Sequence, residues 1–214
     1  MTVLIKCTCK QFKRKTKTQG IVGYVVSLAI IALGFLPVQV IADNGKISVE
    51  LQAKLFLTAL TYEKNMKEKA IRQFDIGILY FPWLPESKKE ALLFSKALNS
   101  FKNKKISGRN FNVFLFTYNG DTGIKEAIAH KHVEVLFIAE GKERNLKEII
   151  QLTRSKNILS WTNKTEYVAS CGVTIGVGIK ENKPKIYINL TSAKEEGADF
   201  SAKFLRIAEI VDSK

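Results

Sequence analysis

The closing stretch of the chain reads CGVTIGVGIK at residues 171–180 and, two residues later, KPKIYINL at residues 183–190. Only Glu181 and Asn182 separate these two strand-like segments. Because so short a connection joins strands that run in opposite directions, the segments are predicted to form an antiparallel β-hairpin. A closing helix is then predicted to start at Asp199 or Ser201, with its apolar side at Phe200, Phe204, Leu205, Ile207, Ala208 and Val211.

Upstream of the hairpin, apolar runs alternate with amphipathic segments. The apolar runs predict strands at residues 71–81, 110–118, 133–139 and 158–162. Apolar residues at helical spacing predict helices at residues 49–69, 87–103, 124–130 and 145–156. Such alternation is typical of βαβ units with a parallel sheet, and continuous apolar strands indicate a sheet covered on both faces. We therefore expect an α/β fold: a three-layer αβα sandwich with a mostly parallel sheet and a C-terminal antiparallel β-hairpin followed by a helix.

The first 42 residues have the pattern of a secretory signal peptide. A basic region without acidic residues, at residues 6–17, precedes an apolar run at residues 21–36. We expect cleavage after Ala42, which leaves residues 43–214 as a single domain in the periplasm. The alternative is an uncleaved N-terminal anchor in the inner membrane, because residues 21–42 are just long enough to span a bilayer if Pro37 and Gln39 are tolerated within the span.

The charge of the chain does not predict a nucleic-acid partner. Residues 1–42 hold 6 of the 34 basic residues and none of the 20 acidic ones, so the remainder carries 28 against 20, or +8. These charges are spread along the predicted helices, whereas nucleic-acid binding needs a focused basic stripe with interleaved aromatic residues. An acidic partner or an anionic membrane surface remains compatible with this charge.

Cysteine and histidine usage predicts neither a cofactor nor a metal site. Cys171 is the one cysteine after residue 42, and it is predicted to be a small buried residue at the start of a strand. The alternatives are a free reactive thiol and an intermolecular disulfide. His130 and His132 have no third ligand nearby in the sequence. No Ser-His-Asp order or paired-carboxylate motif is present either, so the sequence favours a protein that is not an enzyme.

Two loops follow predicted strands at the same expected edge of the sheet. Their polar residues are Asp121, Thr122 and Gly123 in the first loop, and Thr162, Lys164 and Thr165 in the second. Ligands of parallel α/β proteins bind beyond the carboxyl ends of the strands, and free amides at a helix start can hold an anion. Ordinary turn and cap chemistry accounts for these residue types; the alternative is a site for a small acid or phosphate between the two loops.

Three glycines of the hairpin region stand at even spacing. Gly172, Gly176 and Gly178 share one face of the strand, so backbone, a side chain such as Trp161, or a ligand is expected to pack closely there. Gly172 is accordingly assigned a structural role. Asn189 ends the second hairpin strand and is also predicted to be structural, because a buried amide is nearly always hydrogen-bonded.

The loop after the first strand carries an exposed-aromatic candidate. Trp83 lies between Pro82 and Pro85 and is predicted to pack over the loop; it is also a candidate interface residue. Ser87 is expected to N-cap the following helix, with Glu90 completing a capping box.

With these elements placed, the chain resembles the YfiR-like family of bacterial periplasmic proteins. The family shows a strand with a threonine-containing loop, a Gly-led strand, a strand ending in Ile-Asn, an Ala-rich turn and a Leu-rich helix after a Ser. The matching residues are ILSWT at 158–162, GVTI at 172–175, INL at 188–190 and SAKFLRIA at 201–208. The front half departs from the family: residues 55–65 lack its Trp-Pro pair, and its paired cysteines are absent. Disulfide-based redox sensing is therefore not carried over. Tyr62 of the first helix is a candidate interface residue, because that helix is a candidate docking surface.

The resemblance implies a periplasmic, non-catalytic regulatory or sensor module. Such a module binds an inner-membrane signalling protein, as repressors of diguanylate cyclases do, and a small molecule or anion modulates it. The alternative is a periplasmic solute-binding accessory protein of a transport system, because one αβ lobe resembles half of a periplasmic binding protein. A second copy of the chain, giving a homodimer, is a further partner considered.

Overall fold

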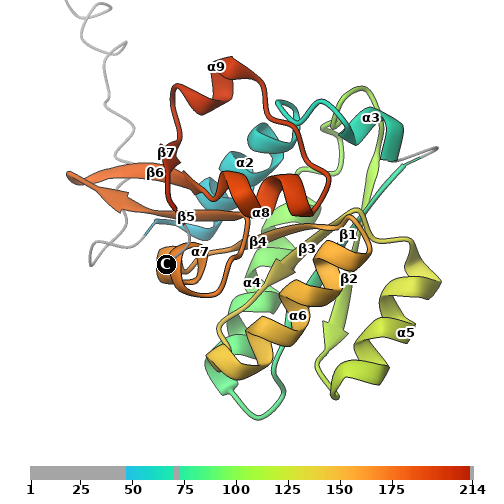
Figure 1. The fold of residues 1–214 in the computed structure, drawn as a ribbon. Coiled ribbons are helices and arrows are strands. Elements are labelled where there is room, and N and C mark those ends of the chain that lie inside the picture. The colour runs from blue at the N-terminus through green and yellow to red at the C-terminus, as the bar shows by residue number, and fades with distance from the viewer. Residues whose placement is uncertain (1–46, 70–72, 213–214) are drawn as a thin grey trace, which may run out of the picture. The chain divides into compact units, whose positions relative to one another are not determined.

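The computed structural model describes residues 47–69 and 73–212, which build a seven-stranded sheet (Figure 1). The strand order is β2-β1-β3-β4-β5-β6-β7, and every neighbouring pair is parallel except β5 with β6. The strands are β1 (Phe74–Tyr80), β2 (Phe111–Thr117), β3 (Val135–Ile138), β4 (Leu159–Thr162), β5 (Ile175–Lys180), β6 (Lys183–Ile188) and β7 (Glu209–Ile210). The predicted α/β fold with a mostly parallel sheet is confirmed.

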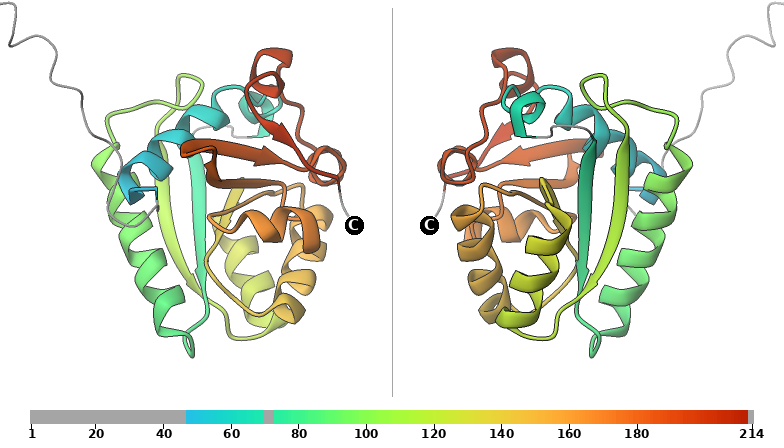
Figure 2. Two further views of the ribbon diagram at one scale, coloured as in Figure 1. Left: turned by 90° about the vertical axis from the view of Figure 1, so that its left-hand side faces the viewer. Right: turned by 90° about the vertical axis from the view of Figure 1, so that its right-hand side faces the viewer.

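Helices lie on both faces of the sheet, as the two side views show (Figure 2). One face is covered by α2 (Val49–Leu60) and α4 (Pro85–Ser100). The other is covered by α5 (Asp121–Lys131), α6 (Glu143–Ser155) and α7 (Thr165–Ser170). Three short helices lie outside these sets: α3 (Met66–Lys69), α8 (Leu190–Glu195) and α9 (Ala202–Leu205).

The central strand β3 shows how the sequence produces the three layers. Its side chains alternate between the two faces, because successive residues of a strand point in opposite directions. Val135 and Phe137 join the core under α2 and α4, whereas Leu136 and Ile138 join the core under α5 and α6. Phe137 stacks on Phe94 of α4 at a centroid distance of 4.1 Å. A fully apolar strand is therefore what a sheet covered on both faces requires.

The predicted hairpin is confirmed in its direction and its turn. β5 and β6 pair antiparallel, with Lys180 opposite Lys183. The turn residues Glu181 and Asn182 have φ of 52° and 59°. Left-handed backbone at both positions is the geometry of a two-residue type I′ turn, whose twist matches that of the strands it joins.

The predicted first helix ends earlier than its periodicity suggests. α2 stops at Leu60 instead of continuing to residue 69. The backbone after it turns to pair with the C-terminal segment: Lys64 N donates to Asp199 O at 2.8 Å, and Ser201 N donates to Tyr62 O at 3.0 Å. Hydrogen bonds between residues more than 130 positions apart in the chain thus replace local helical hydrogen bonds. The local spacing of apolar residues does not reveal such distant partners.

The prediction of a closing helix is also wrong over most of its length. A single turn, α9, follows Ser201, whose Oγ accepts from Phe204 N. The chain then becomes β7, and Val211 N donates to Ile188 O at 2.8 Å. The strand β7 therefore pairs with the exposed edge of β6, although its residues belong to the segment with helical spacing. The helix that follows the hairpin is instead α8, which begins directly after Asn189.

The second predicted helix starts two residues earlier than expected. α4 begins at Pro85, and Leu84 is its N-cap residue without a side-chain hydrogen bond. Proline suits the first turn of a helix because it has no N–H that would need a partner. Ser87 is not a cap. Its buried hydroxyl accepts from Phe81 N at 3.1 Å and so ties the helix to the end of β1.

The close packing expected at the hairpin glycines comes from α7, in a segment that was predicted to be a loop. A Cβ at Gly176 would lie 2.6 Å from Val168 Cγ2, and one at Gly178 would lie 2.4 Å from Thr165 Cγ2. Both contact residues belong to α7. The side chain that packs there is therefore not Trp161, which lies in the core on the α2 side.

We expect Gly178→Ala to lower the free energy of unfolding by about 1 kcal/mol, because the new methyl overlaps the Thr165 methyl group. Thr165→Ser removes that methyl group and should relieve the overlap. Urea denaturation of the two single variants and the double variant checks this. A double variant whose loss equals the sum of the single losses would contradict the proposed overlap.

The predicted signal peptide, residues 1–42 with cleavage after Ala42, lies outside the described residues. Within the part of the chain that the structure describes, no helix is both long and apolar enough to cross a membrane.

Candidate functional site

A pocket of about 540 Å³ lies at the edge of the sheet where β3 and β4 end. Glu140 follows β3, and Asn163 and Lys164 follow β4. Parallel strands place these residues together because their carboxyl ends meet at one edge. The rest of the lining comes from the start of α2, the first turns of α4, and β5; its residues are Ile47, Val49, Gln52, Glu86, Lys89, Glu90, Leu93, Val177, Gly178 and Ile179.

Glu90 connects three of these elements by hydrogen bonds. Its Oε2 accepts from Glu140 N at 2.8 Å, and its Oε1 accepts from Asn163 Nδ2 at 3.3 Å. Asn163 Nδ2 also donates to Gln52 Oε1 at 2.6 Å. One carboxylate and one amide thus join α4, the β3 end, the β4 end and α2.

Two groups that line the pocket have shifted pKa values. Burial raises the pKa of the Glu90 carboxyl, although the hydrogen bonds from Glu140 N and Asn163 oppose this rise. Lys164 Nζ lies 2.9 Å from Glu140 Oε2, and this bond raises the pKa of the Lys164 ammonium. At neutral pH Lys164 is therefore a cation that is already paired with a carboxylate.

The backbone of the β3 loop is held from α7. Tyr167 Oη donates to Gly141 O at 2.9 Å. A Cβ at Gly141 would lie 2.2 Å from the Phe81 ring, so the loop passes directly over that ring. Burial raises the pKa of the Tyr167 hydroxyl, which keeps it protonated as a donor. This rim of the pocket is consequently preorganised by the fold.

The second predicted loop reaches the pocket, and the first does not. Lys164 lines the pocket, and the buried Thr162 shapes its turn, because Thr162 Oγ1 accepts from Lys164 N at 3.2 Å. Thr165 contacts the hairpin as described above. Asp121, Thr122 and Gly123 form the start of α5 after β2, and β1 and β3 lie between β2 and β4 in the sheet.

Sequence reasoning missed Glu90, Glu140 and Gln52 as pocket residues. Glu140 directly follows a predicted strand, so the rule that selected Lys164 also points to it. Glu90 was expected in a capping box and instead bonds to loops 50 and 73 residues away. Gln52 carries no local signal, because only the packing of α2 brings it to this edge.

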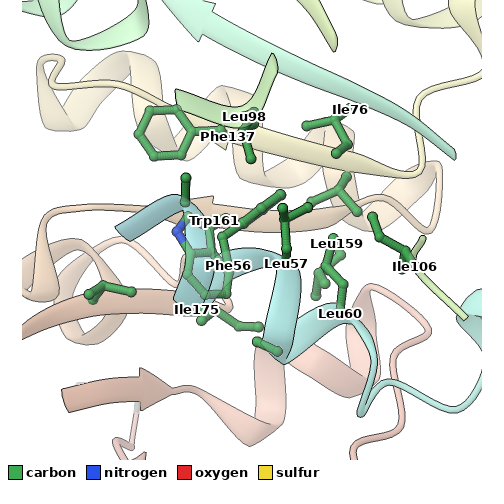
Figure 3. Close-up of a cluster of buried hydrophobic side chains, with 14 of the residues drawn as sticks. Phe56, Leu57, Leu60, Ile76, Leu98, Ile106, Phe137, Leu159, Trp161 and Ile175 are labelled. Carbon is green, nitrogen blue, oxygen red and sulfur yellow. The ribbon is translucent and has the colours of Figure 1, made fainter. Parts of the chain in front are cut away.

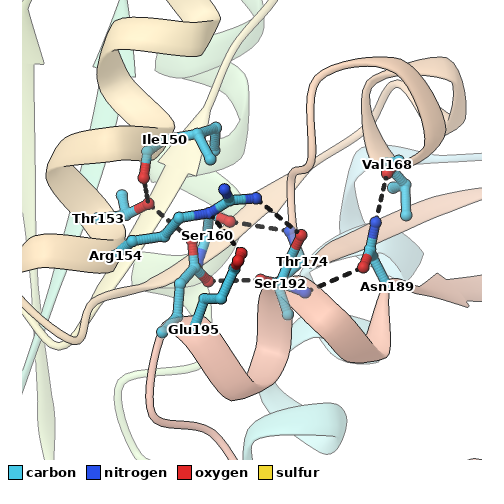
Figure 4. A network of polar contacts seen from close by, with 10 residues as sticks. Ile150, Thr153, Arg154, Ser160, Val168, Thr174, Asn189, Ser192 and Glu195 are labelled. Carbon is cyan, nitrogen blue, oxygen red and sulfur yellow. Dashed lines mark hydrogen bonds and ion pairs between the residues drawn. The ribbon is translucent and has the colours of Figure 1, made fainter. Parts of the chain in front are cut away.

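Asn189 and Gly172 lie near the start of β5, where Ile188 pairs with Ile175. Asn189 Oδ1 accepts from Ser192 N at 3.0 Å and N-caps α8, while its Nδ2 donates to Val168 O at 3.1 Å (Figure 4). Gly172 has a φ of 76°, and a Cβ there would lie 2.7 Å from Arg154 Nη2. Both residues thus hold loops against the sheet.

We expect Asn189→Ala to cost about 2 kcal/mol of stability, because it removes the cap of α8 and leaves a buried carbonyl without its donor. Asn189→Ser keeps an N-cap acceptor without burying a charge, although it loses the amide donor, so its loss should be smaller. Chemical denaturation of both variants decides this. Equal losses for the two would show that the cap contributes nothing.

The remaining candidate residues are placed as follows. Trp83 is 49% exposed and packs edge-on against Phe81 and Tyr118. Tyr62 is half-buried and stacks on Phe204. Cys171 is buried with a free thiol whose pKa burial raises. His130 and His132 are exposed at the end of α5, and the described residues contain no cluster of three or more potential metal ligands.

A family model described as YfiR/HmsC-like matches residues 84–209, which is more than half of the 214 residues. The chain belongs to the YfiR/HmsC-like family. The predicted resemblance is therefore confirmed, and the match begins after α2, in agreement with the divergent front half. Among curated proteins, none matches this YfiR/HmsC-like chain.

Three solved structures share the fold of this YfiR/HmsC-like protein. The first is an ABC domain in complex with L-Trp from Streptococcus pneumoniae, with a TM-score of 0.53 and 14% identity, and the match covers 76% of this chain and 61% of that chain. The second is a conserved domain protein from Vibrio cholerae, with a TM-score of 0.55 and 16% identity, and the match covers 78% of this chain and 61% of that chain. The third is a ligand-free, open substrate-binding protein with adhesive properties from Clostridium difficile, with a TM-score of 0.52 and 14% identity, and the match covers 70% of this chain and 58% of that chain. This chain thus covers about three fifths of each. At such identities the likeness shows the α/β fold alone.

Proposed function

We propose that this YfiR/HmsC-like protein is a periplasmic, non-catalytic regulator that binds an inner-membrane signalling protein of the diguanylate cyclase type. The observation that carries the proposal is the family match over residues 84–209. The pocket at the ends of β3 and β4 supports modulation by a small ligand, because it lies where α/β proteins bind ligands. It also adjoins α2, the candidate docking helix.

Site-specific photo-crosslinking in cells tests the partner. A photoreactive residue replaces Lys54, which is exposed on α2, or Trp83, and Glu126 on the exposed side of α5 is the matched control. We expect mass spectrometry to identify an inner-membrane cyclase captured from Lys54 or Trp83 and not from Glu126. Capture of only a second copy of this chain would overturn the proposal and favour a homodimer.

The second candidate function is a periplasmic solute-binding accessory of a transport system. The pocket favours it, since a volume of about 540 Å³ suits a small solute. Capture of a transporter subunit in the same crosslinking experiment would support this function and contradict the first.

Export is part of the proposal. We infer that residues 1–42 direct the chain to the periplasm and are removed after Ala42. The intact mass of the protein from the periplasmic fraction should match residues 43–214. A full-length mass in the membrane fraction would instead show the anchored form.

A further inference from the structure

The polar interior of the pocket presents hydrogen-bond acceptors. An ionised Glu90 has acceptors only, as does the Oε1 atom of Gln52. Asn163 donates through Nδ2 to both of these groups, and its Oδ1 is buried with no hydrogen-bond partner in residues 47–69 and 73–212. The polar atoms that a molecule meets here are therefore mainly acceptor oxygens, and of those named Asn163 Oδ1 lacks a donor within these residues.

The charge of the lining is negative. It contains three carboxylates, of Glu86, Glu90 and Glu140, and two ammonium groups, of Lys89 and Lys164. Lys164 is paired with Glu140 at 2.9 Å, and Lys89 with Glu86 at 3.8 Å. Within the described ranges, no cation lies within ion-pair distance of Glu90. Glu90 is thus the lining carboxylate without an ion pair in this part of the chain, and Lys164 favours its charged form from beyond ion-pair distance.

The remaining walls are apolar. Ile47, Val49, Leu93, Val177 and Ile179 line the same pocket. Leu93 is 45% exposed and Ile179 is 39% exposed. Covering such surface is favourable by about 25 cal/mol per Å². An occupant with an apolar body would gain this energy, whereas a fully polar one would not.

We propose that the pocket binds a small organic cation, namely a primary ammonium group carried on an apolar body. The ammonium group has three donors and no acceptor, so it matches Glu90 and Asn163 Oδ1. The apolar body then lies against Leu93, Val177 and Ile179. This assignment names the modulating ligand and in that respect rests on the proposed function. It also differs from the acid or phosphate that the loop sequences suggest, because Lys164 is already paired with Glu140.

Isothermal titration calorimetry on protein purified after expression of the full chain tests the ligand class. The probes are phenethylamine and hexylamine, 3-phenylpropionate as the anion of the same body, and phenylalanine as the zwitterion. We expect at least one of the amines to bind, and to bind more tightly than the anion and the zwitterion. No heat from either amine up to about 10 mM, equivalent to a Kd weaker than a few millimolar, would overturn the proposal. Tighter binding of 3-phenylpropionate or phenylalanine would do so too.

Two charge variants are expected to change amine affinity in opposite directions, which a misfolded protein would not show. Glu90→Gln should weaken amine binding by about tenfold or more, the loss of one charge-assisted hydrogen bond. Lys164→Gln raises the net negative charge and should strengthen it several-fold. Glu126→Gln on α5 is the control and should leave the affinity unchanged. An amine affinity that stays unchanged in Glu90→Gln would overturn the assignment of Glu90 as the ammonium acceptor.

The two proposals fail separately. An amine that binds the purified protein while cells yield no cyclase crosslink would contradict the regulator function alone. A cyclase crosslink from Lys54 or Trp83, with no amine binding, would contradict the ligand assignment alone.

Discussion

Glu196→Ala is expected to lower the free energy of unfolding by about 3–4 kcal/mol. The Glu196 carboxylate is fully buried at the end of α8. It accepts from Thr153 Oγ1 at 2.6 Å, Thr174 Oγ1 at 2.5 Å and Ser160 N at 2.7 Å. Each buried donor that loses its acceptor costs about 1–3 kcal/mol. The network joins α6, β4 and the entry to β5, so its loss affects the whole C-terminal half (Figure 4).

Two variants separate hydrogen bonding from charge at this position. Glu196→Gln keeps one acceptor but turns an NH₂ group toward donors. With the amide oxygen in the place of Oε2, glutamine keeps the bonds from Ser160 N and Thr174 Oγ1. Its NH₂ then faces Thr153 Oγ1, which can accept because it donates to Ile150 O, so we expect a loss of less than about 1 kcal/mol. Glu195→Gln is the control, since the partly exposed ion pair of Glu195 with Arg154 at 2.9 Å should contribute less than about 1 kcal/mol. Urea denaturation measures all three; a Glu196→Ala loss no larger than the control would refute the network's role.

The same carboxyl predicts a pH dependence. Burial raises the pKa of the Glu196 carboxyl above its ordinary value of 4.5, although the hydrogen bonds to it oppose this rise. The folded state then binds the proton more tightly than the unfolded state. Its contribution to stability is therefore fully present below pH 4.5 and is lost as pH rises through the folded pKa. The difference in unfolding free energy between the natural protein and Glu196→Gln should fall as pH rises over this range. A difference that stays constant with pH would contradict the raised pKa.

Phe56→Ala is expected to destabilise the protein by about 3–5 kcal/mol, the usual cost of truncating a buried phenylalanine. Phe56 is fully buried where α2 meets the sheet. Its ring lies edge-on to Trp161 of β4 at a centroid distance of 4.8 Å (Figure 3). It also lies edge-on to Phe94 of α4 at 5.6 Å. Alanine would leave a cavity between α2, α4 and β4. This cavity cannot close unless α2 moves.

Lys54→Ala on the exposed side of the same helix is the matched control, and alanine there should change stability by less than about 0.5 kcal/mol. Thermal unfolding of both variants is the measurement. A Phe56→Ala variant as stable as Lys54→Ala would mean that α2 is not anchored through this ring. Because Gln52 of α2 also bonds to Asn163 of the pocket, a loosened α2 should in addition weaken amine binding.

The candidate site was predictable in part. Lys164 and Thr162 were found because residues after parallel strands meet at one edge, a rule that needs only the order of elements. Asp121, Thr122 and Gly123 obey the same rule, but strand order separates them from the pocket by β1 and β3. Strand order depends on how crossovers pack, so the sequence of elements alone does not reveal it.

The sequence alone was enough for the α/β class, the family, the antiparallel hairpin and the alternation of strands with helices. Each of these follows from local pattern: apolar runs, helical spacing, and a two-residue turn. Only the tertiary structure decided that α2 ends at Leu60, that residues 209–210 form a strand rather than a helix, and that Glu90 faces two distant loops. These outcomes depend on partners far away in the chain, such as Asp199 for Lys64 and Ile188 for Val211. Hydrogen bonds to such partners outweigh local helical propensity, whose differences amount to less than about 1 kcal/mol per residue.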